Sequence, residues 1–570
     1  MTPSIVKRHA LAATTETMRR MMLITVGAQH RRFVAATADP RAAQAARLHR
    51  ILRTNAATEY GVRYGFSSIR TIADFQTRVP IVTYDQVRPH IKKMMDGAPG
   101  VLTAERPYQY LLTSGSTNEP KYVPVTRSFR REYATPLQFY YLYRQHPDIF
   151  RPGGILSMVS PAIEGWTAAG VPYGAASGLT YLSQNALVRT LYAVPYDAFT
   201  IKDFAAKYYV ILRMAVERDL RVILMANPST LGLLLKELNQ HAESLIQDIA
   251  DGRITAPAPI DPDVRRRLAS RLRPNPQRAR ELARIRDADG GTLPPVRVWP
   301  RLRAVVCWRD ASAALYLPAL EASLGDVPVY NLGYAASEGL GTFRLAGAGD
   351  EVLAITGHLF EFCDVDEIDG AVGSAGPLRL CDELEEGHRY FIVMTTSGGL
   401  YRYHIDDIVE VRGFVNRTPA LRFVQKGTNS YSFTGEKLTE AQIIAAVTAA
   451  TSAHGVTPTF FTALPIFGEP PHYRVMVEGP ASGTSVPANL LAGAIDAELS
   501  RLNVEFEGKR KSRRLASTQV VFLPPGFFEQ YREATHRTKR DAQIKFKHLN
   551  PDALFHETVA AFDTRSPVCG

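Results

Sequence analysis

Small hydroxyl residues, a glycine and a lysine gather in one stretch whose pattern suits phosphate binding. Residues 111–125 read LLTSGSTNEPKYVPV, with apolar runs on both sides of the polar centre. The backbone N–H groups and hydroxyls of such a turn can face an anion, and Gly115 has no Cβ to block close approach. Lys121 adds a mobile point charge suited to phosphate oxygens. We therefore predict a strand, an anion-binding turn and a second strand. The candidate ligands are Thr113, Ser114, Gly115, Ser116, Thr117 and Lys121.

The same composition also fits an ordinary polar hairpin, because Ser, Thr, Gly, Asn and Pro are common turn residues. The stretch is not a Walker loop. Gly115 is followed by no second glycine at the required spacing, and Lys121 is followed by Tyr122 rather than by Ser or Thr. Any nucleotide site here must use another arrangement, which the rest of the chain has to supply.

Two carboxylates follow predicted strands further along the chain. Glu338 lies in YAASEG, just after a strand expected over 327–331. A carboxylate at a strand's C-terminal edge can hold a Mg²⁺ that bridges phosphate oxygens. Asp407 ends the run LYRYHIDD, and an acidic residue at a strand end can accept both hydroxyls of a ribose. Each could instead be a turn residue, and for Glu338 taken alone the turn is the better interpretation.

Strands and helices alternate around these residues. Short apolar runs predict buried strands, and longer amphipathic runs predict helices between them. The expected strands include 155–159, 222–225, 302–308, 327–331, 391–394 and 400–407. A helix is expected over 1–55, and 251–300, rich in Pro, Arg and Gly, is expected to be an exposed insertion. The alternation predicts an α/β fold with helices covering layered sheets.

The length of 570 residues exceeds what one hydrophobic core usually organises, so at least two domains are expected. A polar, glycine-containing segment at 425–428 suggests a hinge between them. We predict a large N-terminal domain over 1–424 and a smaller α+β domain over 425–570.

The net charge of +11 suggests anionic ligands or a nucleic-acid surface. Many arginines fall in 264–286 at helical spacing, without aromatic residues for base stacking, which favours a solvated helix face and no nucleic-acid partner. The four cysteines are far apart, a usage typical of a reducing compartment. No apolar run approaches the ~18 residues that a membrane span needs. We therefore expect a cytoplasmic enzyme.

Three motifs, in this order, resemble those of the adenylate-forming superfamily. Within it the chain is similar to the Gretchen Hagen auxin-responsive acyl-acid amido synthetases, and a bacterial-type member is expected. TSGSTNEPK resembles their phosphate loop, YAASEG their Tyr-Ala-Ser-Ser-Glu motif, and TTSGGLYRYHIDDIVEVRGF their Thr-Thr-x-x-Gly-Leu-Tyr-Arg-Tyr-Arg-x-Gly-Asp run. A looser likeness extends over nearly the whole chain. The third motif is long and specific, whereas the first is shared across the superfamily.

The sequence departs from these motifs at three positions. His404 stands where the family run has Arg, Asp406 where it usually has Gly, and Asn118 where the loop usually has Gly or Ser. A glycine at position 406 can adopt a positive φ. Asp tolerates that conformation better than most residues, so the local turn can survive.

The resemblance implies a reaction in two halves. A carboxylate attacks the α-phosphate of ATP to give an acyl-adenylate and pyrophosphate, and an amine, typically an amino acid, then attacks the activated carbonyl to give an amide and AMP. Both reactants of the first half are anionic, so that step needs charge neutralisation and positioning more than a protein nucleophile. The 1–424 domain would bind ATP and the acid, and the 425–570 domain would be a mobile cap.

The resemblance also implies roles for individual residues. Ser114, Ser116, Thr117 and Lys121 would hold the phosphates, Glu338 would coordinate Mg²⁺, Asp407 would bind the ribose, and Tyr334 and Ser337 would lie beside the nucleotide. Lys545, in the basic tail, would reach the α-phosphate and the acyl oxygen. Lys539 and Lys547 are rivals for that role, because spacing cannot choose among the tail lysines.

Two other functions are compatible with the same motifs. A thioester-forming acyl-CoA ligase shares the first half-reaction, although those enzymes usually have Gly where Ile544 precedes Lys545. A non-catalytic ligand-binding homologue is the other, motivated by Asp406. The acid, the amine and the oligomeric state are open. Phe139, Tyr140 and Tyr173 are candidates for an aromatic wall of the acid pocket.

Overall fold

The computed structural model divides into two compact units, which are described separately. The larger comprises Met1–Thr113 and Lys121–Gln425, and the smaller comprises Ser114–Pro120 and Lys426–Gly570. The described residues are 3–113, 120–133, 136–149, 151–346, 351–365, 367–427, 430–479, 486–528 and 548–550, without the side chains of 3–16, 18, 312, 315 and 369. The division after Gln425 lies beside the boundary placed at 424/425 from the sequence. The functional roles of the two domains stay predictions.

A four-stranded parallel sheet lies within the larger unit. Its order is β3 (Ile155–Ser157), β6 (Val222–Leu224), β7 (Ala304–Cys307) and β8 (Val329–Asn331), and every neighbouring pair is parallel. The four residues of β7 are fully buried, as expected for a strand covered on both faces. The apolar runs of the sequence therefore marked these strands correctly, and the mixed α/β fold is confirmed.

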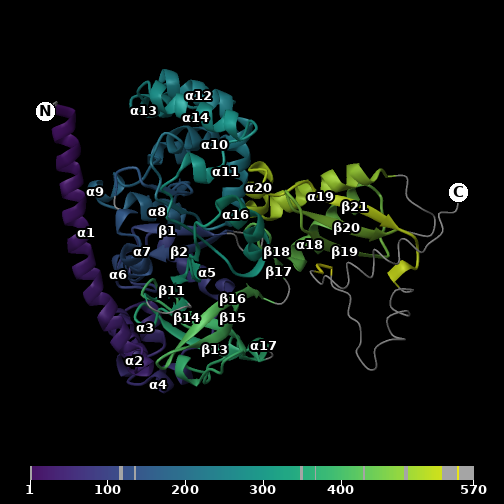
Figure 1. Cartoon of the computed structure of the whole chain (residues 1–570). Helices are drawn as coiled ribbons and strands as arrows, with labels where there is room; N and C mark the ends of the chain where they lie inside the picture. The colour runs from purple at the N-terminus through teal and green to yellow at the C-terminus, as the bar shows by residue number, and fades with distance from the viewer. Residues whose placement is uncertain are drawn as a thin grey trace. The chain divides into compact units, whose positions relative to one another are not determined.

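Helices pack around this sheet. They are α10 (Phe204–Ala215), α11 (Pro228–Gln240), α12 (Ala242–Asp251), α13 (Pro262–Ala269) and α14 (Pro276–Ala288). Figure 1 shows α12, α13 and α14 together at one end of the larger unit, beyond α10 and α11.

The expectation of an exposed insertion over 251–300 is wrong. Leu268 of α13 and Leu282 of α14 are fully buried in the same core as α10 and α11. Apolar residues recur at helical spacing between the arginines and provide this buried face. The arginines are paired locally, as Arg267 is with Asp197 at 2.7 Å, which supports the solvated helix face over a polyanion surface.

A six-stranded antiparallel sheet forms the other large layer of this unit. Its order is β11 (Thr342–Arg344), β12 (Glu351–Leu353), β16 (Thr418–Lys426), β15 (Tyr403–Val415), β14 (Arg389–Thr395) and β13 (Leu359–Asp364). The expectation that one strand ends at Asp407 is wrong, because β15 continues to Val415. The strand passes through an irregularity opposite Phe391 and Val393, where Asp406 has φ +66°. This bulge keeps the strand paired on both sides of it.

The predicted phosphate loop lies in a third sheet, of order β2-β1-β5-β4. The strands β1 (Gln109–Thr113) and β2 (Lys121–Val125) are antiparallel, and Thr113 pairs with Lys121 at the end of the ladder. The predicted strands on both sides of the turn are therefore confirmed, whereas 114–119 lie outside the described residues. The other two strands are β5 (Pro172–Gly174) and β4 (Gly165–Trp166).

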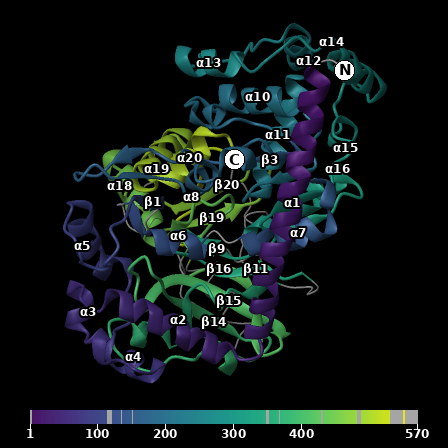
Figure 2. The same cartoon turned by 90° about the vertical axis from the view of Figure 1, so that its left-hand side faces the viewer.

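The N-terminal region is helical but divided in two. The helix α1 (Pro3–Ala36) ends before α2 (Pro40–Asn55), which starts with a proline and is capped by the Asp39 carboxylate accepting from the Ala42 N–H at 3.1 Å. Figures 1 and 2 show α1 running along one side of the larger unit, next to α7 (Tyr140–Gln145). None of the helices in the described part of the chain has the length and hydropathy that crossing a membrane requires.

The smaller unit has an α+β core. The strands β19 (Phe460–Ile466) and β20 (His472–Glu478) are antiparallel, and β21 (Gln519–Leu523) pairs with β20 in parallel. Its helices are α18 (Glu440–Ala453), α19 (Ala488–Leu502) and α20 (Val504–Lys511). The remaining α-helices in the described part of the chain, all in the larger unit, are α3 (Glu59–Arg63), α4 (Ile72–Arg78), α5 (Tyr84–Met95), α6 (Arg127–Tyr133), α8 (Ala176–Leu182), α9 (Ala186–Arg189), α15 (Pro295–Val298), α16 (Leu317–Leu324) and α17 (Ile368–Ala371).

Candidate active site

A tyrosine joins the second and third sequence motifs. Tyr334 follows β8, and its hydroxyl donates a hydrogen bond of 2.7 Å to Oδ2 of Asp407 in β15. Its ring stacks on Phe423 of β16, with centroids 5.7 Å apart and planes at 2°. Both Tyr334 and Asp407 are only 6% exposed. The end of the parallel sheet and the middle of the antiparallel sheet therefore meet at this pair.

Glu338 lies in a tight hairpin beside that pair. The strands β9 (Ala335–Ala336) and β10 (Gly339–Leu340) are antiparallel, which leaves Ser337 and Glu338 as the turn. Glu338 is 7% exposed, yet no residue in the described ranges donates a hydrogen bond to it or forms an ion pair with it. A buried carboxylate without a partner is costly, and a bound cation would offset that cost.

Tyrosines surround the Glu338 carboxylate. Burial raises the pKa of Tyr84 to about 12, and the Glu338 charge adds to that rise. The pKa of Tyr403 is also raised well above its ordinary value, first by burial and then by Glu338. For Tyr334 the causes are burial, then Asp407, then Glu338. These phenols stay neutral, so they offer hydrogen bonds rather than charge to the site.

Magnesium fits this arrangement. Mg²⁺ sites at nucleotides usually take one or two protein carboxylates and complete the shell with water and phosphate oxygens. Across the described ranges no three His, Cys, Asp or Glu residues gather in a way that could hold a metal without such help. Glu338 is therefore suited to a metal that arrives with a polyphosphate rather than to a resident structural ion.

Lys121 approaches the same tyrosines from the predicted phosphate loop. It is 9% exposed at the start of β2, and its Nζ lies 5.5 Å from the ring centroid of Tyr84. The Tyr84 hydroxyl in turn accepts a hydrogen bond of 2.6 Å from the Tyr122 N–H. Tyr84 thus interacts with the Lys121 cation and with the charge of Glu338.

The structure brings together six of the predicted site residues, and two of them, Tyr334 and Asp407, share a hydrogen bond. Those that it groups are Thr113, Lys121, Tyr334, Ser337, Glu338 and Asp407. Others lie outside the described residues, namely Ser114, Gly115, Ser116, Thr117, Lys545 and its rivals Lys539 and Lys547. All the predicted roles stay predictions.

Sequence reasoning missed two residues of this network. Tyr84 begins α5 after a capping box formed by Thr83 and Gln86, a signal that marks the helix start. That signal places Tyr84 in the helix but does not tell which loop it faces. Phe423, which stacks on the Tyr334 ring, belongs to β16, a strand far from Tyr334 in the sequence.

The departures from the family run are accommodated. Asp406 occupies the left-handed region at φ +66°, so the substitution for glycine keeps the expected backbone conformation. His404 places Nε2 3.8 Å from Oδ1 of Asp406 and packs its ring edge-on against Phe391 at 5.1 Å. Asn118 lies outside the described residues.

Of the three aromatic residues predicted to line the acid pocket, one lies near the site and two lie in the core. Tyr173 lies edge-on to Tyr122, with centroids 5.2 Å apart, and so borders the strand that starts at Lys121. Tyr140 instead is buried against His30 of α1, at 4.9 Å. Phe139 packs beside buried residues of α7 and β7.

A buried histidine supports the hairpin that carries Glu338. His358 is fully buried, stacks on Phe129 at 5.9 Å, and has no hydrogen-bond partner for either ring nitrogen in the part of the chain described. A Cβ on Gly339 would come within 3.0 Å of its Nε2, so the hairpin needs glycine there. Burial lowers the pKa of His358 to about 3.

Acid is expected to destabilise the protein through His358. Its folded-state pKa lies below its ordinary value of 6.5, so its contribution to stability is fully present above pH 6.5 and is lost as the pH falls towards 3. Between pH 7 and pH 4 the free energy of unfolding should fall by on the order of 3 kcal/mol more in the wild type than in His358→Leu. Urea unfolding at both pH values measures this. The matched control is His49→Leu, at an exposed position, and equal pH slopes in wild type and His358→Leu would contradict the prediction.

Known proteins resemble the chain along most of its length. It matches the GH3 family N-terminal domain over 29–329, the GH3 family central domain over 351–426 and the GH3 family C-terminal domain over 441–553. An indole-3-acetic acid-amido synthetase, GH3.8 of Oryza sativa subsp. indica, is 27% identical over 91% of this chain and 89% of the relative. A jasmonoyl–L-amino acid synthetase, JAR6 of Nicotiana attenuata, is 24% identical over 87% and 88%.

Solved structures support the fold. The acyl acid amido synthetase AtGH3.15 in complex with 2,4-DB has a TM-score of 0.62 and 21% identity, and the match covers 96% of each chain. This likeness bears on the fold alone. The two relatives named above are plant proteins and give no support to a bacterial-type subgroup.

Proposed function

Because the chain belongs to the GH3 family, we propose that it is an ATP-dependent acyl-acid amido synthetase that joins a carboxylic acid to an amino acid through an acyl-adenylate. The three family domains account for most of the chain. Two relatives matched over most of their length are named as an indole-3-acetic acid-amido synthetase and as a jasmonoyl–L-amino acid synthetase. The reaction class predicted from the sequence, an acid–amino acid ligase, is confirmed by them.

The observation that carries the site assignment is the buried Glu338 carboxylate beside the Tyr334–Asp407 pair. A buried acid that has no cation partner within the described ranges, and whose charge acts on neutral phenols, suits a magnesium-bound polyphosphate. Asp407, whose Oδ2 is fixed by the Tyr334 hydroxyl, would accept the ribose hydroxyls. ATP and Mg²⁺ are thus the proposed cofactors.

Charge neutralisation is the main task of the first half-reaction, because an acid carboxylate must approach the α-phosphate. Lys121 would contribute one positive charge from the start of β2. Ser114, Ser116 and Thr117 would add N–H and hydroxyl donors. Lys545 of the C-terminal domain would reach the α-phosphate, and its withdrawal would open the acyl-adenylate to the amine.

The acid is proposed to be small, with an apolar body. The names of the relatives reported above give indole-3-acetic acid and a jasmonoyl group as the acyl part of the product. Tyr122 and Tyr173 would offer an aromatic wall beside Lys121. The second substrate is proposed to be an amino acid, and the sparse cysteines support a cytoplasmic location.

A screen of carboxylic acids tests the proposed function. Purified protein with ATP and Mg²⁺ should release pyrophosphate only when a suitable acid is added, and a chelator of divalent cations should abolish that release. Mass spectrometry of the products should then show an amide when amino acids are supplied. A thioester formed with coenzyme A would favour the acyl-CoA ligase instead, and acid-independent or absent pyrophosphate release across the panel would contradict both.

A further inference from the structure

A second hollow opens at the edge of the parallel sheet that lies away from the Tyr334–Asp407 pair. Its volume is about 530 Å³, and Pro152 and Gly153, just before β3, line it together with Arg218, which precedes β6. All four strands of that sheet run in the same direction. Tyr334 follows the C-terminal end of β8, so the hollow and the candidate active site lie at opposite edges.

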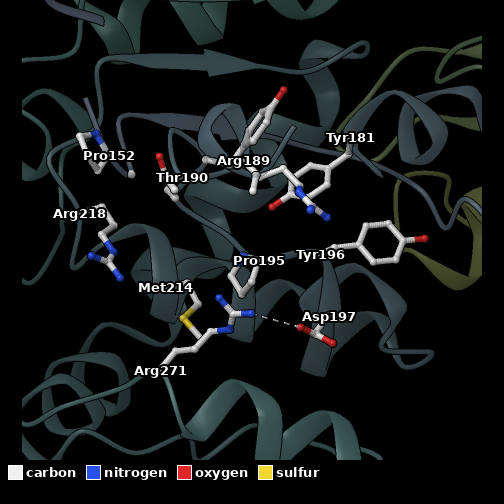
Figure 3. A pocket seen from close by; sticks show the side chains of 14 residues that line it. Pro152, Tyr181, Arg189, Thr190, Pro195, Tyr196, Asp197, Met214, Arg218 and Arg271 are labelled. Atoms are coloured by element: carbon white, nitrogen blue, oxygen red, sulfur yellow. Dashed lines mark ion pairs between the residues drawn. The ribbon is translucent and has the colours of Figure 1, made fainter. Parts of the chain in front are cut away.

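Positive charge dominates the lining of this hollow. Arg189 at the end of α9, Arg218 after α10 and Arg271 after α13 reach it from three separate segments. Figure 3 shows these three side chains on different sides of the space. The convergence of guanidinium groups from three segments is not expected of a random exposed surface, because like charges repel one another.

The carboxylate in the lining pairs with only one of these arginines, Arg271. Asp197 is held by Arg267 at 2.7 Å and lies 4.0 Å from Arg271. Within the described ranges neither Arg189 nor Arg218 has an ion-pair partner. Two guanidinium groups thus remain available to an anion, and guanidinium is the side chain best suited to carboxylate and phosphate oxygens.

Tyrosine rings supply the apolar part of the lining. Tyr181 is buried, and its ring lies 4.6 Å from that of Tyr192 and 5.8 Å from that of Tyr196. The Tyr181 hydroxyl donates to the Val194 carbonyl at 3.1 Å, and the Tyr196 hydroxyl accepts from the Ala162 N–H at 2.6 Å. Because their hydroxyls are engaged, the rings are held in place and present flat faces.

From these features we propose that the hollow is a second small-molecule site, which binds a planar aromatic anion. The tyrosine faces would take the ring, and Arg189 and Arg218 would take the negative group. A volume of about 530 Å³ lies in the usual range for ligands of this size. An aromatic carboxylate and a nucleoside monophosphate share this chemistry. The proposal stands apart from the amido synthetase function, because none of its residues belongs to that site.

Photolabelling of the full chain with 4-azidobenzoate tests the site directly. Peptide mapping should place the label in 181–197 or 214–218. The double variant Arg189→Ala, Arg218→Ala should lower that labelling by about tenfold or more, since each charge-assisted hydrogen bond contributes that much to affinity. Both side chains are exposed, so the fold should be retained. The matched control, Arg284→Ala, removes an exposed arginine of α14 outside the hollow.

Competing ligands show which class of anion the site binds. Protection of the label by benzoate identifies a carboxylate ligand, and protection by AMP but not by benzoate identifies a nucleotide; both results support the site. Equal labelling in the double variant and the wild type would overturn it, as would protection by inorganic phosphate as strong as that by either ring compound. Should the double variant unfold, Ala186→Trp, which fills the hollow from the start of α9, should abolish labelling in its place.

Discussion

Asp407→Ala and Glu338→Ala are each expected to lower acid-dependent ATP–pyrophosphate exchange by about 10²- to 10³-fold, the usual loss when one preorganised polar contact to the reacting groups is removed. Asp407→Ala would remove the proposed contact to the ribose, and Glu338→Ala would remove the proposed magnesium ligand. Glu338→Ala breaks no hydrogen bond within the described ranges, so its thermal unfolding temperature should change little, whereas Asp407→Ala leaves the buried Tyr334 hydroxyl without its acceptor and should lower stability by about 1–3 kcal/mol. Exchange of labelled pyrophosphate into ATP, with a saturating acid, measures the effect.

A graded control separates chemistry from structure at this site. Tyr334→Phe keeps the ring stacked on Phe423 and removes only the hydroxyl that holds Asp407. Its exchange rate should fall by about tenfold, less than for Asp407→Ala, because one hydrogen bond to a charged group is lost. Wild-type exchange in Asp407→Ala or in Glu338→Ala would remove that residue from the site.

The three sequence motifs carried most of the information about the site. Each motif contains residues whose chemistry can be read without a structure: Lys121 as a cation, Glu338 and Asp407 as carboxylates. Their proximity could not be read, because it depends on Tyr334 reaching Asp407 across more than seventy residues of sequence. The contribution of Tyr84 depends on packing between a helix start and a strand, for which one sequence gives no signal.

The fold could be predicted from the sequence where a strand is buried on both faces, because such a strand is a continuous apolar run. The strands β6 and β7 are such runs, and the sequence located both to within a few residues. The six-stranded antiparallel sheet was not recognised as one unit, since β12 pairs with β16 rather than with β13, the next strand along the chain. The segment 251–300 was wrongly predicted to be an exposed insertion, because its Pro and Arg residues outnumber its leucines. Those few leucines, such as Leu268, are the side chains that anchor its helices in the core.

Glu361→Gln is expected to destabilise the larger unit by about 3–5 kcal/mol, the usual loss when a buried ion pair is left with one charge. Glu361 and Arg402 are both fully buried, and Nη2 of Arg402 lies 3.0 Å from Oε1 of Glu361. Nε of Arg402 also donates to Glu361, and Nη1 and Nη2 donate to the carbonyls of Gln76, Val79 and Gly376 at 2.7–2.9 Å. Removing the carboxylate charge leaves a cation that has no access to water. Urea unfolding measures the change in free energy.

The double variant Glu361→Leu, Arg402→Met tests whether the loss of stability comes from the uncompensated charge of Arg402. Replacing both ions by apolar residues removes the uncompensated charge, so the double variant should be more stable than Glu361→Gln. A double variant at least as unstable as the single one would contradict this account.

The backbone of Arg402 also connects the ion pair to the site. Its carbonyl accepts a hydrogen bond of 3.0 Å from the N–H of Val82, which lies two residues before Tyr84. Loosening the pair should therefore lower pyrophosphate exchange together with stability, whereas Glu338→Ala should lower exchange alone.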